Sequence, residues 1–294
     1  MAIFPMNRII FILILMLSCS AMASQEKEVP NIVPVEWVKE HLDDKRLVIL
    51  DIRDYEDYKQ GHVAGAVNIP GLANLFDPET WLLPKLDHLQ SLFSKAGVDN
   101  NSLVVTYDNG DFFWAARAYW ILEVLGHHNV GIMEYAYGSY LENHLPNSSE
   151  DTAVTEKTFV PRVDNEQIQT KLSTLLAIGK ETIIDGRAND HYLGIESIAD
   201  RFGHIPTALH YPCTNNFQVT DAGAKMKDLD ELATIYADIP KDKEIILYCQ
   251  GGAESALNYI VLQKLGYKAS IYDGSWKEWG NDPVVPINNP SADK

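Results

Sequence analysis

The chain has few cysteines, few basic residues and a single long hydrophobic run. Its 294 residues include three cysteines, and 24 Lys and Arg stand against 41 Asp and Glu, which gives a formal charge of −17. Three cysteines are too few for a small fold that depends on several disulfides. The acidic excess disfavours binding to nucleic acid or to an anionic membrane surface. A hydrophobic content of 46% is ordinary for a globular protein, and the length favours two domains.

The hydrophobic run lies at the N-terminus and has the form of a secretory signal. Arg8 precedes the apolar residues 9–17, and the "AMA" of residues 21–23 is a small-x-small cleavage site. The run is too short to span a bilayer comfortably. We therefore predict a signal peptide over residues 1–23, cleaved after Ala23, and an exported, periplasmic protein with no membrane span. The segment "MLSC" leaves an alternative open, a lipoprotein with lipid attached to Cys19.

The rest of the chain contains two copies of one pattern. Residues 47–70 ("LVILDIRDYEDYKQGHVAGAVNIP") and 182–212 ("TIIDGRANDHYLGIESIADRFGHIPTALHYP") each hold an apolar run, Asp-x-Arg, a polar helix-like stretch, Gly-His and a final proline. Residues 102–133 and 244–272 form a second matching pair at nearly the same spacing. This spacing fits a duplicated domain and is far longer than a solenoid repeat.

Each copy predicts alternating strands and helices. The runs "LVIL", "SLVV", "TII" and "EIIL" are typical of strands buried on both faces of a parallel sheet. After Cys249 the apolar residues follow helical spacing as far as Gly266. We predict an α/β protein with two domains, residues 31–146 and 160–290, each with a central, mostly parallel sheet flanked by helices. The polar residues 145–159 separate them.

A cysteine stands where one predicted strand meets a helix. In open α/β sheets, sites form beyond the carboxyl ends of the strands, and Cys249 lies at such an end. Gly251 and Gly252 allow the loop of residues 249–255 to curl so that successive amide groups point inward. Such a loop at a helix N-terminus favours negative charge, so we expect a lowered pKa and a nucleophilic thiolate at Cys249. A buried structural cysteine is the alternative.

The chain resembles the tandem rhodanese-domain sulfurtransferases over nearly all of its length after the predicted signal. The matching segments are "DIRDYEDYKQGHVAGAVNIP", "YDNGDFFWAARAYWILEVLGH", "GHIPTALHYP", "LYCQGG" and "YDGSWKEWG". The resemblance implies two domains, each with a five-stranded parallel sheet, and a catalytic cysteine, Cys249, in the second domain alone. Asp108 stands at the matching position of the first copy, so that copy cannot form a persulfide.

The resemblance also implies a reaction, sulfur transfer that needs no metal or other cofactor. The thiolate of Cys249 takes the outer sulfur of a small anionic donor, thiosulfate or 3-mercaptopyruvate, and holds it as a persulfide. A thiol acceptor, either a small molecule or a thioredoxin-like protein, or cyanide then removes that sulfur. Inward amides of the loop are expected to stabilise the charge on the persulfide. The loop residues concerned are Gln250, Gly251, Gly252, Ala253 and Glu254.

This chain lacks the cations that thiosulfate-using family members carry around the cysteine. Gly251, His191 and Glu254 stand at the three positions concerned. The remaining candidates for binding the donor anion are Arg201, Arg187, and His191 in its protonated form. Arg187 belongs to the Asp-x-Arg that recurs in the first copy, which favours a structural role, so both interpretations stay open for it. Glu254 either raises the pKa of the thiol or faces solvent and complements the helix dipole.

Other functions stay open or are disfavoured. Phosphatases of this fold need an Arg in the loop, and here Ser255 stands at the sixth position after Cys249, so that function is disfavoured. The missing cations leave a second hypothesis open, a catalytically weak exported persulfide carrier or binding module. Cys213 is either an unreactive cysteine or a partner that approaches Cys249 as a resolving thiol.

Overall fold

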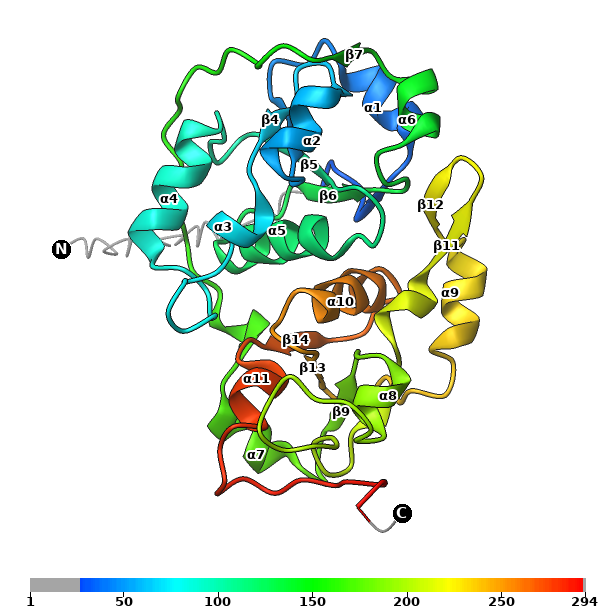
Figure 1. Cartoon of the computed structure of the whole chain (residues 1–294). Coiled ribbons are helices and arrows are strands. Elements are labelled where there is room, and N and C mark those ends of the chain that lie inside the picture. The colour runs from blue at the N-terminus through cyan, green and yellow to red at the C-terminus, as the bar shows by residue number, and fades with distance from the viewer. Residues whose placement is uncertain (1–26, 293–294) are drawn as a thin grey trace, which may run out of the picture.

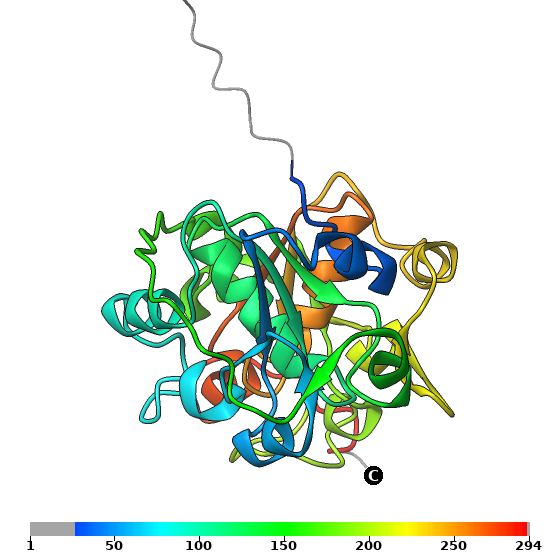
Figure 2. The ribbon, with the colours of Figure 1, turned by 90° about the horizontal axis from the view of Figure 1, so that it is seen from above.

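The computed structural model describes residues 27–292, so the predicted signal segment, with Ala23 and Cys19, lies outside the described residues. Two α/β domains are stacked one on the other (Figure 1). Seen from above, the N-terminal domain lies over the C-terminal domain (Figure 2). Between residues 27 and 292, no helix combines the length and the hydrophobicity needed to cross a membrane.

The N-terminal domain is built on a five-stranded sheet in which every paired strand is parallel, in the order β1-β6-β5-β2-β4. Along β2, Val48 and Leu50 pack on one face with α5, whereas Ile49 packs on the other face with α1, as the alternation of side chains in a strand requires. The strands of this sheet are β1 (Ile32–Val33), β2 (Leu47–Asp51), β4 (Val67–Asn68), β5 (Leu103–Tyr107) and β6 (Val130–Met133). The helices are α1 (Val35–His41), α2 (Tyr55–Gln60), α3 (Gly71–Asn74), α4 (Leu86–Lys95), α5 (Phe113–Val124) and α6 (Ser139–His144).

The C-terminal domain repeats this topology with the order β10-β9-β13-β14-β8, again all parallel. The interface-side face of its sheet packs on α9 and α10, and the outer face packs on α7 and α11. Its strands are β8 (Ile168–Gln169), β9 (Thr182–Asp185), β10 (Leu209–His210), β13 (Ile245–Tyr248) and β14 (Ala269–Tyr272). Its helices are α7 (Lys171–Ala177), α8 (Asn189–Tyr192), α9 (Leu229–Ile235), α10 (Glu254–Lys264) and α11 (Ser275–Trp279), with 3₁₀ turns η1 (Asn165–Gln167) and η2 (Cys213–Asn216).

Two small two-stranded antiparallel sheets lie outside the central sheets. β3 (His62–Val63) pairs antiparallel with β7 (Asn147–Ser148), and β11 (Phe217–Thr220) pairs with β12 (Gly223–Met226). The β11–β12 hairpin belongs to the C-terminal domain but reaches the N-terminal one, where the amide of Met226 donates to the carbonyl of Glu134 at 2.8 Å. The pairing of β7 also ties the start of the polar interdomain segment to the first domain.

The two longest buried helices form the layer between the sheets. α5 and α10 lie against each other (Figure 1), and both helices are buried on nearly every side. One hydrophobic cluster runs through them and joins side chains of both sheets. The sequence prediction of two α/β domains with parallel sheets is therefore confirmed, and the two domains share one continuous core.

Candidate active site

Cys249 lies directly after β13, which is the middle strand of the C-terminal sheet, and α10 begins five residues later at Glu254. α11 fastens the cysteine from a second side. The hydroxyl of Ser275 accepts a hydrogen bond from the Cys249 amide at 3.1 Å, and the amide of Trp276 donates to the Cys249 carbonyl at 2.9 Å. The thiol thus stands at the strand-to-helix turn that the sequence predicts, on a backbone held at both its amide and its carbonyl.

Donors of the loop point toward the sulfur. The amide of Gly252 donates to Sγ of Cys249 at 3.0 Å. The amide of Gly251 and both the amide and hydroxyl of Ser255 also favour the thiolate. The Ser255 Oγ is buried and makes no hydrogen bond within residues 27–292. Ser255 therefore joins the loop residues as part of the site, and its signal in the sequence was its place in the first turn after the two glycines.

The expectation of a lowered pKa at Cys249 is wrong. The residue is 0% exposed, and burial raises the pKa of its thiol above the ordinary value. The negative charge of Glu254 raises that pKa further. These two effects outweigh the amides, because moving a thiolate out of water costs more than the hydrogen bonds return. Burial and Glu254 accordingly favour the neutral thiol of Cys249 over its thiolate.

Glu254 turns toward the loop rather than toward solvent. Its Oε2 accepts a hydrogen bond from the amide of Gln250 at 3.5 Å. Burial raises the pKa of this carboxyl to about 6, and the nearby charge of Asp185 acts in the same direction. Of the two alternatives that the sequence leaves open, the structure therefore favours the one in which Glu254 opposes the thiolate.

Glu254→Gln is expected to make Cys249 more reactive. Above about pH 6 the Glu254 carboxyl is charged and disfavours the thiolate of Cys249. The side-chain amide of glutamine is neutral, so this substitution is expected to lower the pKa of the thiol. Alkylation of Cys249 by iodoacetamide, followed by peptide mass mapping, should then rise at lower pH than in the wild type. Glu150→Gln, at an exposed carboxylate, is the control. Coincident pH profiles for Glu254→Gln and wild type would show that this charge does not reach the sulfur.

The equivalent loop of the N-terminal domain holds a carboxylate in place of a sulfur. Asp108 follows β5 and is completely buried. Its carboxylate accepts hydrogen bonds from the amides of Gly110, Phe112 and Ala115 at 3.3, 3.1 and 3.1 Å. Burial nevertheless raises the pKa of Asp108 to about 6. The loop that this fold builds at the end of the central strand thus directs amides at an acceptor in both domains.

Arg187 is held as an ion pair beneath the site. Its Nε and Nη2 bind the carboxylate of Asp185, and Nη2 also donates to the carbonyl of Gly203 at 2.8 Å. Arg53 and Asp51 repeat the arrangement in the first domain, which supports a structural role. The Nη1 of Arg187 is buried without a partner among the described residues, so its contact with a donor stays a prediction.

Arg201 is held by backbone carbonyls near the C-terminus of the described residues. Its Nε, Nη1 and Nη2 donate to the carbonyls of Gly280, Val285 and Trp279 at 3.2, 2.9 and 2.7 Å. These bonds attach the guanidinium to the segment that leaves the C-terminal end of α11, whereas the Cys249 loop lies at the other end of that helix. Arg201 therefore anchors the C-terminal segment of the chain, and its binding of the donor anion stays a prediction.

His191 and Cys213 keep the predictions made for them. Nε2 of His191, on α8, lies 4.0 Å from a carboxylate oxygen of Glu196. Cys213 and Cys249 are both free and buried, and the pKa of Cys213 is raised well above its ordinary value, mainly by burial and then by Glu254 and Cys249. Substrate binding by His191 stays a prediction, and the two alternatives for Cys213, an unreactive cysteine and a resolving thiol, both stay open.

A buried arginine of the N-terminal domain contacts the Cys249 loop. Arg117, on α5, is 0% exposed and donates through Nη1 to Oδ1 of Asp273 at 2.6 Å and to the carbonyl of Gly252 at 3.3 Å. The other carboxylate oxygen of Asp273 accepts a hydrogen bond from the amide of Leu83 at 2.6 Å. The sequence patterns did not single out Arg117, although a lone cation in the apolar stretch "FWAARAYWILEV" was a signal that it has a buried partner.

The two loop glycines predict different responses to substitution. Gly252 has φ +90°, and a Cβ there would lie 2.9 Å from Nη1 of Arg117 and 3.0 Å from the carbonyl of Asp273. A Cβ at Gly251 would meet only the ring of Trp81, at 3.9 Å. We expect Gly252→Ala to lower the free energy of unfolding by about 1–3 kcal/mol and Gly251→Ala to leave it within about 0.5 kcal/mol, as measured by urea denaturation. Equal losses in both variants would contradict this geometry.

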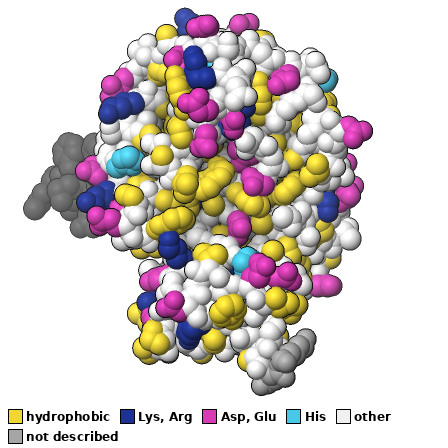
Figure 3. Space-filling view, in the orientation of Figure 1, with side chains coloured by type: hydrophobic (Ala, Val, Ile, Leu, Met, Phe, Trp, Pro, Cys, Tyr) yellow, Lys and Arg dark blue, Asp and Glu magenta, His cyan; other side chains and the backbone are white. Residues whose placement is uncertain are grey.

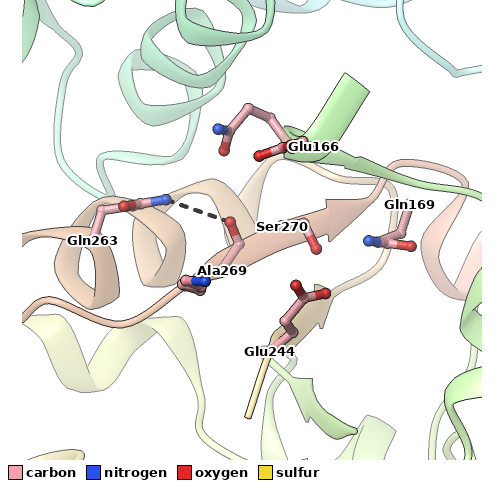
Figure 4. Close-up of a pocket in the computed structure, with 8 residues that line it drawn as sticks. Glu166, Gln169, Glu244, Gln263, Ala269 and Ser270 are labelled. Carbon is pink, nitrogen blue, oxygen red and sulfur yellow. Dashed lines mark hydrogen bonds between the residues drawn. The ribbon is translucent and has the colours of Figure 1, made fainter. Parts of the chain in front are cut away.

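A cavity of about 520 Å³ lies at the end of the C-terminal sheet where β13 and β14 begin (Figure 4). Glu244, just before β13, and Ala269 and Ser270, at the start of β14, line it together with Gln169 and Gln263. Cys249 follows the other end of β13, so this cavity is separate from the thiol. The side chains that line this cavity include no cysteine.

The family of the chain is established by comparison with known proteins. The family described as "Rhodanese-like domain" matches residues 34–143 and residues 169–282, which together make up more than half of the chain. The chain therefore belongs to the rhodanese family and carries two of its domains. Within that family it is a member of the tandem rhodanese-domain sulfurtransferases, as its relatives show.

Three relatives cover nearly the whole protein. A protein of Synechococcus elongatus, provisionally named a thiosulfate sulfurtransferase, is 32% identical and covers 90% of this chain and 87% of its own. The sulfur carrier protein TtuD of Thermus thermophilus is 30% identical over 87% and 95% of the two chains. The crystal structure of SseA from Escherichia coli, described as a 3-mercaptopyruvate sulfotransferase, is 28% identical, with a TM-score of 0.74 over 84% of this chain and 99% of its own.

Proposed function

We propose that this protein transfers a sulfur atom from a small anionic donor to a thiol or to cyanide through a persulfide on Cys249. The observation that carries the proposal is the hydrogen bond from the Gly252 amide to the sulfur, in a loop fixed between β13, α10 and α11. Because the Gly252 amide already donates a hydrogen bond to the sulfur, negative charge that develops on the sulfur is stabilised with little reorganisation of the loop.

The reaction has two displacements. The Cys249 thiolate attacks the outer sulfur of thiosulfate, the S–S bond of the donor breaks, and sulfite leaves with its electron pair. With 3-mercaptopyruvate the C–S bond breaks, and the thiol proton of the donor ends on the carbon of the pyruvate released. An acceptor thiolate or cyanide then attacks the outer sulfur of the persulfide and returns Cys249 as a thiolate. This is covalent catalysis with ping-pong kinetics.

The raised pKa of Cys249 sets the pH dependence of the first displacement. The nucleophile is the thiolate, and burial together with Glu254 favours the neutral thiol. The rate of persulfide formation therefore increases as pH rises toward the pKa of the thiol. Proton removal from Cys249 is part of each cycle that begins from the resting thiol.

Both donors stay in the proposal. The names of the Synechococcus and Escherichia coli relatives point to thiosulfate and to 3-mercaptopyruvate respectively. Steady-state kinetics with each donor and cyanide test the proposal, with thiocyanate measured in both assays and sulfite or pyruvate as the second product. Turnover with at least one donor is expected. Absence of thiocyanate with both donors would contradict the proposed sulfurtransferase activity.

A sulfur carrier is the second candidate. The raised pKa of Cys249 and the carboxylate of Glu254 both slow attack on a donor, and the Thermus relative is named a sulfur carrier protein. A carrier would accept sulfur from a partner protein and hold the persulfide without turning over small donors. A persulfide that forms only from a partner's persulfide, and not from thiosulfate or 3-mercaptopyruvate, would favour this candidate.

We also propose export to the periplasm, supported by the cation, apolar run and "AMA" of the first 23 residues. N-terminal sequencing of the protein recovered from a periplasmic extract is expected to begin at Ser24. A lipid-modified cysteine at position 19 would favour the lipoprotein alternative, and an intact Met1 would contradict both.

A further inference from the structure

A half-open cavity of about 340 Å³ lies between the domains, beside the catalytic loop. The N-terminal domain lines it with Trp81 and its two neighbours. The C-terminal domain lines it with Gly251, Gly274, Lys277, Glu278 and Asn281. On the face drawn in Figure 3, hydrophobic side chains gather over α3 and the domain junction. Because Gly251 belongs to both the loop and the cavity wall, a small molecule in the cavity lies next to the loop that holds Cys249.

Lys277 stands in this cavity with its charge uncompensated. Its amide donates to the carbonyl of Gln250 at 3.0 Å, so its backbone is fixed to the catalytic loop. Its Nζ lies 3.3 Å from the ring centroid of Trp81 and makes no salt bridge with any carboxylate of residues 27–292. The neighbouring Glu278 instead pairs with Lys171 and accepts the hydroxyl of Tyr272.

The other cations near the loop are already neutralised. Arg187 is paired with Asp185, and Arg117 is paired with Asp273. Residues 249–255 contain no Lys or Arg. A cation over an exposed aromatic ring is stabilised by only about 0.5–1 kcal/mol, so an anion with full charge can draw the ammonium of Lys277 away from Trp81.

Trp81 is placed for this contact by its backbone. It has φ +61°, which is strained for a bulky residue, and its amide donates to the carbonyl of Asp77 at 2.8 Å. The turn is tied to the C-terminal domain through the bond from the Leu83 amide to Asp273. The first domain therefore presents the indole to Lys277 from a fixed turn.

We propose that Lys277 is the residue that receives the anionic end of the sulfur donor, with Trp81 holding the ammonium in place until the donor arrives. The group recognised is the sulfonate of thiosulfate or the carboxylate of 3-mercaptopyruvate, each next to the sulfur to be transferred. This inference rests on the proposed function, because it assigns the donor-binding cation of that same site. Binding changes no covalent bond, and it directs the outer sulfur of the donor toward Cys249.

Kinetics with the better donor test the role of Lys277 in binding. Lys277→Met should raise KM about tenfold or more while kcat stays within about threefold, since one charged hydrogen bond is lost in binding. Lys277→Arg should stay close to wild type. Lys264→Met, at the far and exposed end of α10, removes the same charge and is expected to leave KM unchanged. An unchanged KM in Lys277→Met would overturn the proposal.

A rescue variant separates donor binding from a structural role of Lys277. A side chain at Gly251 would enter the same cavity, because only the Trp81 ring lies within 4 Å of its Cβ position. The double variant Gly251→Lys/Lys277→Met is therefore expected to bring KM most of the way back to the wild-type value. If Lys277 only packed on Trp81, a lysine at position 251 would recover nothing, and that result would count against the proposal.

An unreactive anion tests the inference without sulfur transfer. Methanesulfonate, at constant ionic strength, is expected to slow alkylation of Cys249 by iodoacetamide in wild type and to have at least severalfold less effect in Lys277→Met. Equal protection in the two proteins, or none in either, would overturn the proposal. This result is independent of turnover, so a wild type that is protected but forms no persulfide would refute the proposed function and leave the anion site standing.

Discussion

Replacing Cys249 by serine is expected to abolish sulfur transfer while leaving the fold intact. A serine hydroxyl is close to the thiol in size, and the Gly252 amide that donates to Sγ can donate to Oγ. The hydroxyl cannot form a persulfide, and it is a far weaker nucleophile at neutral pH. We expect thiocyanate formation to fall by at least about a thousandfold, with the thermal midpoint and circular dichroism spectrum close to those of wild type.

Cys213→Ser is the matched control for this experiment. Cys213 is the other cysteine of the described residues, and it is also buried. Its replacement should leave thiocyanate formation within a few-fold of wild type if the chemistry resides on Cys249 alone. Turnover that survives in Cys249→Ser and disappears in Cys213→Ser would move the catalytic role to Cys213.

Replacing Arg117 by methionine is expected to produce the largest loss of stability. Methionine fills much of the space but leaves the Asp273 carboxylate, which is 6% exposed, without its cation. Breaking a buried ion pair on one side costs about 3–5 kcal/mol, because a buried charge stays uncompensated. The free energy of unfolding from urea denaturation should fall by this amount, and Cys249 should become easier to alkylate because the Gly252 carbonyl loses its donor.

Arg46→Met is the control for Arg117→Met. Arg46 pairs with Asp44 and Glu28 on the surface, so its loss should cost less than about 1 kcal/mol. The double variant Arg117→Met/Asp273→Asn should be less destabilised than the sum of its single variants, because no unpaired charge is left. A loss below about 1 kcal/mol in Arg117→Met would show that the first domain does not hold the catalytic loop in this way.

The fold and the position of the thiol could be predicted because both depend on local patterns. Continuous apolar runs mark the strands of both sheets, and β9 and β13 pair in parallel as those runs indicate. Cys249 followed by two glycines and a helical pattern defines the turn by itself. The repetition of Asp-x-Arg in both copies pointed to its structural role, which the pairs Arg53–Asp51 and Arg187–Asp185 show.

The electrostatics of the site could not be predicted, because they depend on packing between distant segments. Burial of Cys249 comes from the whole surrounding structure, and it reverses the pKa shift expected from the loop amides alone. Arg117 and Asp273 are 156 positions apart. The backbone carbonyls that bind Arg201 also lie far from it in the sequence, in the C-terminal segment. The contact of Lys277 with Trp81 likewise joins two domains. No local spacing encodes such contacts.

The most direct test of a nucleophilic sulfur at the end of β13 is the mass of the protein after reaction with a donor. The protein is incubated with excess thiosulfate or 3-mercaptopyruvate, the donor is removed, and the intact mass and the peptide masses are recorded before and after addition of cyanide. The expected result is one added sulfur atom per chain, located on the peptide that contains Cys249 and removed by cyanide. No added sulfur with either donor, or sulfur located on Cys213, would contradict the proposed chemistry.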